Sequence, residues 1–472
     1  FAPLRAVEDA AGSASGAHRR RLTTTPSFAG ILVLLETQVA SLTPAGQYRP
    51  EGGAPVGRRD FLRLVTAGIG AGALAPLSMC AQDSIDLLDE VERRACLFFY
   101  EQADPTTGLV RDRARMEGPE SRDVSSIAAT GFGLSALAIA DSRGYLERGA
   151  PLARVERTLE YLASHVEHER GFFYHFLDVK SGKRIWSSEA SSVDTAWLLC
   201  GVLHCKAHWD RPHIRQLADD LLGRVDWRWM LNGHDTLCHG WTPETGFLPY
   251  RWDEYAELLA MYLLAIGSSS SPIPVSCWDA WRRPVREYEG FTYIDSVAPL
   301  FVHQYSHAWF DFRDRKDRYS DYFENSRFAT MAHRQFCIGL SQQFPWYGPD
   351  LWGVTASDSP FGYRVWGNPY CPPDGTLTPC AAGGSVVFLP EECSRVLRTM
   401  LDRYGKRVWG RYGFVDAFQP GDNWFSPDVI GIDQGIMLLM AENARSGSVW
   451  NEVMSTPEAR RAMEAVNLRK AA

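Results

Sequence analysis

Two kinds of helical segment alternate along most of this chain. Segments such as Val124–Asp141 and Ser191–Trp209 are almost entirely apolar and rich in small residues, whereas Pro151–Glu167 and His213–Val225 carry many charges. A helix that is apolar on all sides is buried, and a helix with one charged side faces water. The alternation therefore predicts an inner layer of helices enclosed by an outer layer.

The same pattern continues to the end of the chain with little strand signal. The other segments expected to be helical are Leu87–Gln102, Asp253–Gly267, Pro299–Phe312, Tyr319–Phe344, Glu391–Tyr404 and Ile432–Ser446. About a dozen helices would supply about six helical hairpins, so we predict an all-α fold in which a single domain, residues 83–472, closes into an (α/α)6 toroid. Loops such as Trp346–Pro379 are too long for simple connections and are expected to carry function.

The N-terminal part of the chain has a different composition. Residues 1–56 are rich in Ala, Gly, Arg, Thr and Pro, and we expect them to be disordered or foreign to the mature protein. In residues 57–82 the sequence GRRDFLR (Gly57–Arg63) is followed by an uncharged run, which resembles a twin-arginine export signal. We therefore expect a periplasmic or secreted protein. Leu77–Cys80 also resembles a lipoprotein box, so lipid attachment at Cys80 is a second option.

Composition narrows the class of partner. A net charge of -8 without a long basic run argues against nucleic acid. No segment after the export signal is long and apolar enough to span a membrane, and we expect a monomer. Aromatic residues make up 12% of the chain, which suits a saccharide-binding cleft, although such rings more often fill a core.

The ten cysteines do not have the spacing of a disulfide scaffold or of a zinc site. Cys371 and Cys380 flank a Pro-Gly loop and could pair in an oxidising compartment, or could equally remain free thiols.

One carboxylate stands inside an apolar segment. Glu257 lies in Arg251–Ser268, whose apolar neighbours would disfavour its charged form and raise its pKa. A raised pKa is what a general acid needs near neutral pH. The alternative is that a structural arginine such as Arg313 neutralises Glu257.

Further carboxylates stand where apolar helices begin. Glu189 and Asp194 precede or open one such helix, and Asp433 opens another with Gln434 beside it. These groups could act in catalysis, but acidic residues at a helix start also satisfy free backbone N–H groups and the helix dipole.

The segment Pro299–Arg313 combines an apolar side with an unusual polar side. His303, Gln304, His307 and Asp311 would lie together on one face of a helix, where a solvated face would carry Lys and Glu. We interpret this face as a cleft wall, with a purely structural role as the alternative. Zinc binding is disfavoured, because the metalloprotease pattern has Glu where this chain has Gln304.

Several loops place aspartates among glycines and aromatic residues, an arrangement that suits sugar hydroxyls and suits turns equally well. With the residues named above, the candidates for substrate binding are His303, Gln304, His307, Asp311, Arg313, Asp358, Tyr363, Trp366, Asp416, Trp424 and Gln434.

Six stretches of the second half of the chain are distinctive. They are PLFVHQYSHAWFDFR (Pro299–Arg313), DYFENSRFATMAHRQF (Asp321–Phe336), LWGVTASDSPFGY (Leu351–Tyr363), DGTLTPCAA (Asp374–Ala382), YGFVDAFQP (Tyr412–Pro420) and NWFSPDVIGIDQGIMLLMAENARSG (Asn423–Gly447). Together they resemble the glycoamylase-like family, the group that contains the bacterial endo-β-1,2-glucanases of glycoside hydrolase family 144. The resemblance extends from about Leu87 to Ala465.

This resemblance implies an exported (α/α)6 barrel that hydrolyses a β-glucan without a metal or another cofactor. The Tyr-Asn-Glu sequence of the family falls on Tyr255–Glu257, so its acid candidate falls on Glu257, and Ala256 replaces the middle Asn. The IDTA stretch of the family falls on Val193–Ala196 and its GIDQG stretch on Gly431–Gly435.

Our prediction is an inverting endo-β-1,2-glucanase with Glu257 as general acid and Asp433 as the first candidate for the base, followed by Asp194 and Glu189. Such pairs of carboxyl groups stand about 6.5–9.5 Å apart. Two alternatives remain open: a helical-barrel polysaccharide lyase, and an exported protein that binds glycans without catalysis.

Overall fold

The computed structural model describes residues 74–365, 367–369, 371 and 373–470. The chain divides into two compact units, Phe1–Ile85 and Asp86–Ala472. Most of the predicted export signal lies outside the described residues, and its last part, including Cys80, belongs to helix α3 (Leu74–Glu101). Export and lipid attachment stay predictions.

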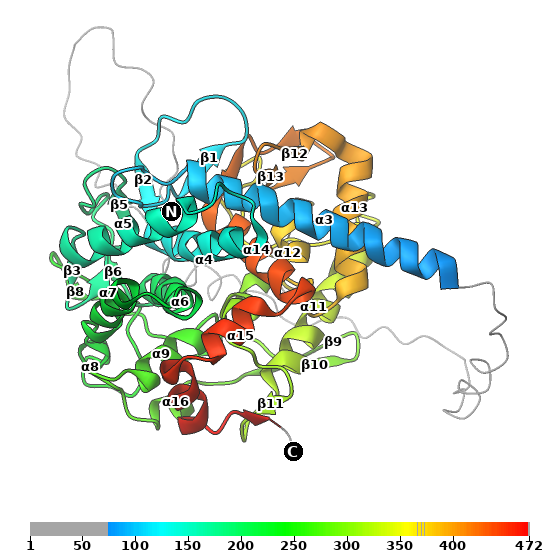
Figure 1. Ribbon diagram of the computed structural model, residues 1–472. Helices are drawn as coiled ribbons and strands as arrows, with labels where there is room; N and C mark the ends of the chain where they lie inside the picture. The colour runs from blue at the N-terminus through cyan, green and yellow to red at the C-terminus, as the bar shows by residue number, and fades with distance from the viewer. Residues whose placement is uncertain (1–73, 366, 370, 372, 471–472) are drawn as a thin grey trace, which may run out of the picture. The chain divides into compact units, whose positions relative to one another are not determined.

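The second unit is mostly helical, as predicted, and Figure 1 shows how its helices follow one another. After α3 they are α4 (Ile127–Arg143), α5 (Ala150–Ser164), α6 (Ser192–His208), α7 (Pro212–Gly223), α8 (Trp227–Met230), α9 (Leu259–Gly267), α10 (Cys277–Ala280), α11 (Tyr322–Gly339), α12 (Pro379–Gly383), α13 (Pro390–Tyr404), α14 (Gly431–Arg445), α15 (Ser448–Met454) and α16 (Pro457–Ala465). Three short 3-10 helices, η1 (Leu300–His303), η2 (Tyr305–Ala308) and η3 (Gly405–Arg407), lie between them.

Short antiparallel strands pair in the connections between the helices. The pairs are β1 (Arg113–Arg115) with β16 (Asp428–Ile430), β2 (Val124–Ser126) with β5 (Phe176–Asp178), β3 (His168–Glu169) with β4 (Phe172–Phe173), β6 (Ala190–Ser191) with β7 (Gly240–Thr242), β7 with β8 (Gly246–Phe247), β9 (Val285–Tyr288) with β10 (Phe291–Ile294), β11 (Arg315–Lys316) with β17 (Arg469–Lys470), β12 (Trp409–Gly410) with β13 (Gly413–Phe414), and β14 (Phe418–Gln419) with β15 (Trp424–Phe425). Strands this short show no alternating pattern in a sequence, which explains why the chain carried little strand signal.

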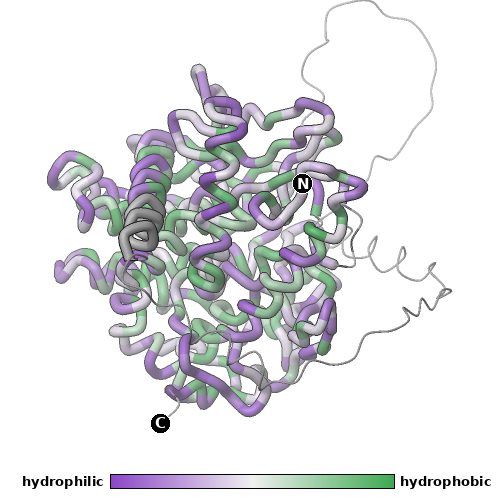
Figure 2. The backbone as a smooth tube through the Cα atoms, turned by 90° about the vertical axis from the view of Figure 1, so that its right-hand side faces the viewer, coloured by the Kyte–Doolittle hydropathy of each residue, from purple (hydrophilic) through white to green (hydrophobic). Residues whose placement is uncertain are grey.

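The helices divide into two kinds by burial. Helices α4, α6, α9 and α14 are buried along nearly their whole length, whereas α5, α7 and α13 bury one side only. Helix α4 contacts α5, α6 and α14, while α6 contacts α7 and α9, and both α9 and α14 contact η2. Figure 2 shows hydrophobic stretches running through the interior and hydrophilic ones outside them. The predicted inner and outer helices are confirmed for these elements.

Helices α4 and α6 touch backbone to backbone. A Cβ atom added at Gly131 would lie 2.3 Å from the carbonyl oxygen of Trp197, and one added at Gly201 would lie 2.1 Å from the carbonyl oxygen of Gly131. Only glycine fits at such a distance, so the small residues of these apolar helices allow the inner layer to pack closely.

Four aromatic rings fill the space between α4, α6 and η2. Trp197 stacks on Trp309 with ring centroids 5.7 Å apart, and Phe132 lies 4.7 Å from Trp309 and 5.6 Å from Tyr305. The indole N–H of Trp309 donates to the hydroxyl of Ser135 at 2.8 Å, so its polar atom is satisfied inside the core.

The strand pairs bring the starts of three inner helices to one end of the helical layer. Strands β2, β6 and β16 run directly into α4, α6 and α14. Backbone hydrogen bonds join the segments around them: Ile127 N donates to His175 O, His175 N donates to Glu189 O, and Gly431 N donates to Asp112 O. Polar residues at these helix starts are therefore held close together.

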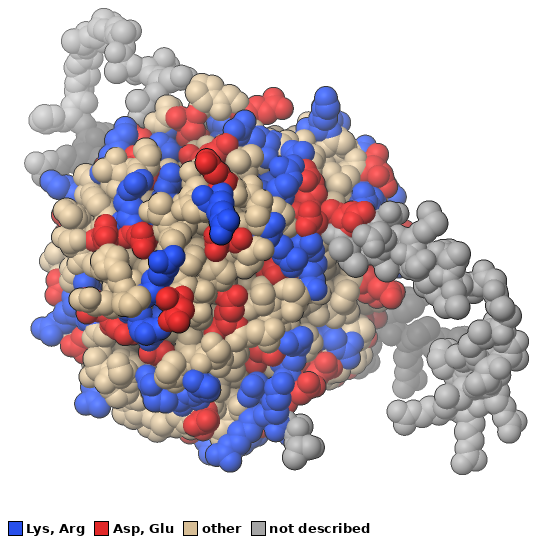
Figure 3. Space-filling model, viewed as in Figure 1, with Lys and Arg blue, Asp and Glu red and all other residues tan. Residues whose placement is uncertain are grey.

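The surface of the second unit carries both signs of charge. On the face seen in Figure 3, Lys and Arg side chains are interspersed with Asp and Glu side chains. None of the helices in the described part of the chain is both long enough and apolar enough to cross a membrane.

Candidate active site

Three of the predicted catalytic carboxylates lie at the starts of inner helices. Asp433 is in the first turn of α14, Asp194 is in the first turn of α6, and Glu257 lies two residues before α9. Each has little exposed surface, so each carboxyl group depends on its neighbours to set its charge.

The segment around Glu257 is not helical throughout, which corrects the prediction. Residues before it form bridges with other segments, Arg251 with Cys238 and Glu254 with Arg282, and this pairing prevents a helix there. The hydroxyl of Ser306 accepts a hydrogen bond from Ala260 N at 3.0 Å and donates to the carbonyl of Glu257 at 2.9 Å, which fixes the first turn of α9.

The carboxyl group of Glu257 is buried without a cationic partner. Its side chain is 6% exposed, and burial together with the charge of Asp194 raises its pKa to about 7. Arg313 pairs with Asp311 at 2.8 Å rather than with Glu257, and among the described residues no basic side chain forms an ion pair with Glu257. Arg313 therefore does not neutralise Glu257, and the group can carry a proton near neutral pH.

Asp433 forms a buried pair with Asp416. Burial raises the pKa of both groups, and the pKa of Asp416 rises further because of the charges of Asp433 and Asp358. Two carboxyl groups this close bind a proton that neither would hold alone. The backbone N–H of Asp358 donates to Asp416 at 2.8 Å, and the thiol of Cys380 donates to Asp433 at 3.3 Å.

An arginine that sequence reasoning missed joins this aspartate pair. Arg113 in β1 forms ion pairs with Asp112 and Asp358, both at 3.1 Å, and its charge lowers the pKa of Asp433 against the effect of burial. The pairing of β1 with β16 places Arg113 opposite Ile430, just before α14. Arg113 stands in a basic, polar stretch of the sequence, so no local signal pointed to it.

Glu189 and Asp194 lie against His175, a second residue that was missed. The Nδ1 atom of His175 is 3.1 Å from Glu189 Oε1 and 3.7 Å from Asp194 Oδ2. Burial alone would lower the pKa of His175, but the charges of Asp194 and Glu189 outweigh it and raise the pKa to about 9. The aromatic loop Gly171–Phe176 that contains His175 was the available signal.

The side chain that caps the start of α6 is Ser191, not one of the two acidic residues. The hydroxyl of Ser191 caps α6 by accepting from Asp194 N at 3.3 Å, and it donates to Asp194 Oδ2 at 2.6 Å. Because a serine caps the helix, the carboxyl group of Asp194 is available to face His175. Burial raises the pKa of Asp194, whereas His175 lowers that of Glu189 against the effect of burial.

Tyr305 of η2 is a further buried polar residue of this region. Burial and the charges of Asp433 and Glu257, among others, raise its pKa well above the usual value. The ring packs on Phe132 and Trp197 of the core. Tyr305 lay on the side of its segment that was predicted to be apolar, and sequence reasoning did not select it.

The segment Pro299–Arg313 corrects a prediction. It forms the two 3-10 turns η1 and η2 instead of one amphipathic α-helix, with Gln304 N donating to Phe301 O and His307 N to Gln304 O. Gln304 lies between the two turns, so the regular helical face that was predicted for residues 303, 304 and 307 is interrupted.

These three polar side chains are buried and bind other parts of the protein. His303 contacts Tyr255 at 3.2 Å and Asp295 at 3.5 Å, Gln304 donates to Ser385 at 2.7 Å, and His307 contacts Ser326 at 3.0 Å. Asp311 pairs with Arg313, whose guanidinium lies 4.1 Å from the Trp450 ring centre. These contacts agree with the structural alternative, and sugar binding by these residues stays a prediction.

Some of the remaining substrate-binding candidates lie near Asp433, and the others lie elsewhere. Asp358, Asp416 and Tyr363 lie near Asp433, and burial together with that charge raises the pKa of Tyr363 well above its usual value. Gln434 instead donates to Phe414 O at 2.8 Å, a structural contact. Trp424 lies in the β14–β15 hairpin. Trp366 lies outside the described residues.

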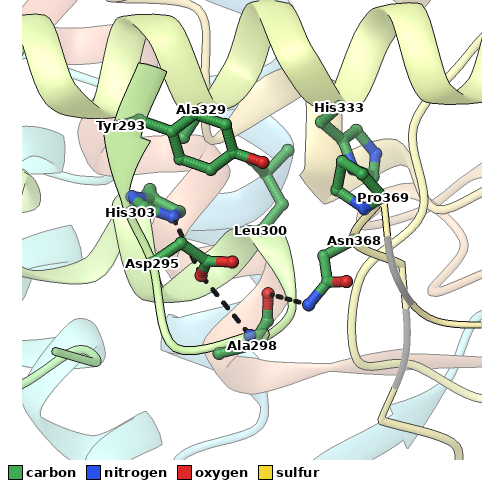
Figure 4. Close-up of a pocket in the computed structure, with 9 residues that line it drawn as sticks. All are labelled: Tyr293, Asp295, Ala298, Leu300, His303, Ala329, His333, Asn368 and Pro369. Carbon is green, nitrogen blue, oxygen red and sulfur yellow. Dashed lines mark hydrogen bonds and ion pairs between the residues drawn. The ribbon is translucent and has the colours of Figure 1, made fainter. Parts of the chain in front are cut away.

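A small cavity lies beside His303 and His333 (Figure 4). It is lined by Tyr293, Asp295, Ala298, Leu300, His303, Ala329, His333, Asn368 and Pro369. Burial lowers the pKa of His333 to about 3, so that ring is neutral, and its Nε2 atom accepts from Val354 N at 3.1 Å. The cavity contains none of the paired carboxylates at the helix starts.

Of the two options for Cys371 and Cys380, the structure shows free thiols. Cys371 and Cys380 are both free and buried, and Cys380 contacts Asp433 instead.

The ligand atoms of His175, Glu189 and Asp194 lie within 4.8 Å of one another, which is the spacing of a cation site. The raised pKa of His175 places a proton where a metal ion would have to bind.

The chain matches known proteins over most of its length. The glycoamylase family model, described as "Putative glucoamylase", matches residues 249–457. A solved protein of the same description from Bacteroides caccae is 30% identical, with a TM-score of 0.76, and the match covers 82% of this chain and 100% of that one.

Two further relatives carry more specific names. The endo-β-1,2-glucanase from Chitinophaga pinensis, solved with sophorotriose and glucose, is 28% identical with a TM-score of 0.75, over 82% of this chain and 98% of that one. An exo-β-1,2-glucooligosaccharide sophorohydrolase from Parabacteroides distasonis is 27% identical over 419 residues, or 80% of this chain. The chain spans 57% of the length of that relative.

Proposed function

Because this chain belongs to the glycoamylase-like family, we propose that it is a glycoside hydrolase that cleaves β-1,2-glucan. The names of the relatives from Chitinophaga pinensis and Parabacteroides distasonis support this substrate. The observation that carries the proposal is the state of Glu257: a buried carboxyl group that forms no ion pair with any basic side chain among the described residues, and whose pKa burial and the charge of Asp194 raise to about 7.

The proposed reaction uses Glu257 as acid and Asp433 as base. Glu257 gives its proton to the glycosidic oxygen while the bond from that oxygen to the anomeric carbon breaks. A water molecule on the opposite face forms the new bond to the anomeric carbon and passes its proton to Asp433. The two steps together invert the anomeric configuration.

The neighbours of Asp433 suit the role of a base. A base must be ionised before the reaction, and burial opposes ionisation. The hydrogen bonds from Asp416 and Cys380 and the charge of Arg113 all favour the ionised form of Asp433. Asp194 and Glu189 are the next candidates, and both lie against His175, at 3.7 and 3.1 Å.

We also propose that the helices close into an (α/α)6 toroid. The buried helices α4, α6, α9 and α14 would form part of the inner ring together with η2, since each of these elements contacts the next. The starts of α6, α9 and α14 would then surround the end of the ring where the substrate binds.

Internal cleavage is the mode that the relatives favour. The match covers 98% of the endo-acting enzyme from Chitinophaga pinensis but 57% of the exo-acting enzyme from Parabacteroides distasonis. The endo-acting relative is thus matched along almost its whole length. We propose that this protein is an endo-β-1,2-glucanase.

The charge of the site disfavours the lyase alternative. A lyase that acts on uronic acids needs positive charges to bind their carboxylates. At this site the basic residues Arg113 and His175 are outnumbered by the carboxyl groups of Glu189, Asp194, Glu257, Asp416 and Asp433. A neutral glucan can approach such a site without electrostatic repulsion.

Incubation of the purified protein with β-1,2-, β-1,3-, β-1,6- and α-linked glucans tests the proposal. We expect oligosaccharides of several lengths from β-1,2-glucan early in the reaction. Release of disaccharide alone from the first minutes would contradict endo action, and products that absorb in the ultraviolet would indicate a lyase. Tight binding of β-1,2-glucan with no product would indicate a glycan-binding protein.

A further inference from the structure

Trp186 is an exposed ring in an uncommon backbone conformation. Its side chain is 56% exposed, and it is the one tryptophan in the described part of the chain that is largely open to solvent. Trp186 and Ser187 both have positive φ angles, 55° and 53°. Bulky residues rarely adopt this region, and such strain persists where the surrounding structure enforces it, commonly at functional sites.

The residues around Trp186 enforce its conformation. On one side Ile185 N donates to Phe176 O at 3.2 Å, and on the other Ser188 N donates to Ile185 O at 3.1 Å. The hydroxyl of Ser188 donates to Phe176 O at 3.1 Å. Arg184 adds a two-point ion pair with Glu244, at 2.6 and 2.9 Å. The turn is thus tied to β5 at both ends, and the indole ring is held outward.

A row of rings leads from Trp186 to the carboxylates. The Trp186 ring lies 5.3 Å from the ring of Phe176, and Phe176 stacks on His175 with centroids 3.9 Å apart and planes at 15°. His175 in turn contacts Glu189 and Asp194. The exposed indole is therefore one ring away from a residue that touches the proposed active site.

We propose that Trp186 forms a binding platform for a glucosyl unit of the substrate, beyond the unit whose bond is cleaved. This inference rests on the proposed function. The flat apolar face of an exposed indole matches the apolar face of a glucopyranose ring, and the indole N–H can bond a hydroxyl group. Burial of this face by the sugar removes apolar area from water, and the fixed turn spares the entropy cost of ordering the ring.

The effect of the Trp186 platform on binding should depend on the length of the oligosaccharide. A long β-1,2-glucooligosaccharide reaches Trp186 while its scissile bond lies at Glu257, whereas the shortest cleaved oligosaccharide does not. We expect Trp186→Ala to raise KM about five- to tenfold on long substrates, with kcat unchanged and with little effect on the shortest. Trp186→Phe, which keeps a ring, should restore most of the affinity.

Val275→Ala is a matched control for the loss of an exposed apolar side chain. Val275 is 45% exposed and lies in the connection between α9 and α10, and it is none of the residues assigned to the proposed site. This variant should keep the parent values on every substrate.

Steady-state kinetics on oligosaccharides of three to eight units, with calorimetric binding in the Glu257→Gln background, separate the outcomes. Weaker binding and higher KM for long chains alone support the platform. Equal KM for Trp186→Ala and parent at every length would overturn it while the proposed function stands. Absence of both turnover and binding in the parent protein would overturn the proposed function and the platform with it.

Discussion

The thiol of Cys380 lies 3.3 Å from Oδ1 of Asp433, and both side chains are buried. A donor at this position stabilises the ionised carboxylate, which is the form that a general base needs. The contact links α12 to the first turn of α14, so Cys380 of α12 helps to set the charge of Asp433 at the start of α14.

Replacement of Cys380 should move the acidic side of the pH profile. Cys380→Ala removes the donor, so the pKa of Asp433 should rise, and the acidic limb of kcat/KM should move upward by about 0.5–1 pH unit. Activity should fall more at pH 5.5 than at pH 8. Cys380→Ser keeps a donor and should shift the limb less. An unchanged limb in Cys380→Ala would argue against Asp433 as the titrating base.

His175 should stabilise the fold in a pH-dependent way. Its pKa is raised from 6.5 to about 9 in the folded protein, so its contribution is fully present below about pH 6.5 and is lost as pH rises through about 9. The shift corresponds to at most about 3 kcal/mol.

Urea unfolding of His175→Gln and parent at pH 6 and pH 9.5 tests this sign. The variant should be less stable by about 1–3 kcal/mol at pH 6, and the difference should shrink at pH 9.5. His213→Gln is the control, because His213 is exposed and its ion pair with Glu160 contributes little. A loss that is the same at both pH values would show that packing, not charge, explains the effect.

The close contact of α4 and α6 leads to a second prediction about the free energy of unfolding. In Gly131→Ala the new Cβ would meet the backbone of Trp197, so the free energy of unfolding should fall by several kcal/mol, on the order of the largest core substitutions. Gly223→Ala in α7 has nothing within 4 Å of the new Cβ and should be neutral or stabilising by up to about 1 kcal/mol. Equal thermal stability of the two variants would contradict the close helix contact.

Removal of metal ions should leave catalysis intact. Protonated His175 supplies the positive charge between Glu189 and Asp194 that a cation would otherwise supply. Dialysis against a chelator should therefore retain turnover of β-1,2-glucan. Loss of activity that returns when Ca²⁺ or Zn²⁺ is added would show that this group of residues holds a metal.

The sequence was informative where the burial of a residue or a helix depends on its immediate neighbours in the chain. The apolar surroundings of Glu257 correctly indicated a buried carboxyl group, and the small residues of Val124–Asp141 and Ser191–Trp209 indicated buried helices. Both properties depend on local composition, which a sequence displays directly.

Properties that depend on distant segments were not predictable in the same way. Arg113 reaches Asp358 across 245 residues of chain, and the approach depends on the pairing of β1 with β16. The polar residues 303, 304 and 307 fit a helical wheel, but the segment forms 3-10 turns and its side chains bind separate partners. Periodicity gives no information about such partners.

The central claim is that the carboxyl group of Glu257 is the proton donor in β-1,2-glucan hydrolysis, and Glu257→Gln tests it most directly. The amide keeps the size of the side chain but has no acidic proton to give, so kcat should fall by about a thousandfold while the calorimetric affinity for β-1,2-glucooligosaccharides stays near that of the parent. A kcat within tenfold of the parent value would contradict the account.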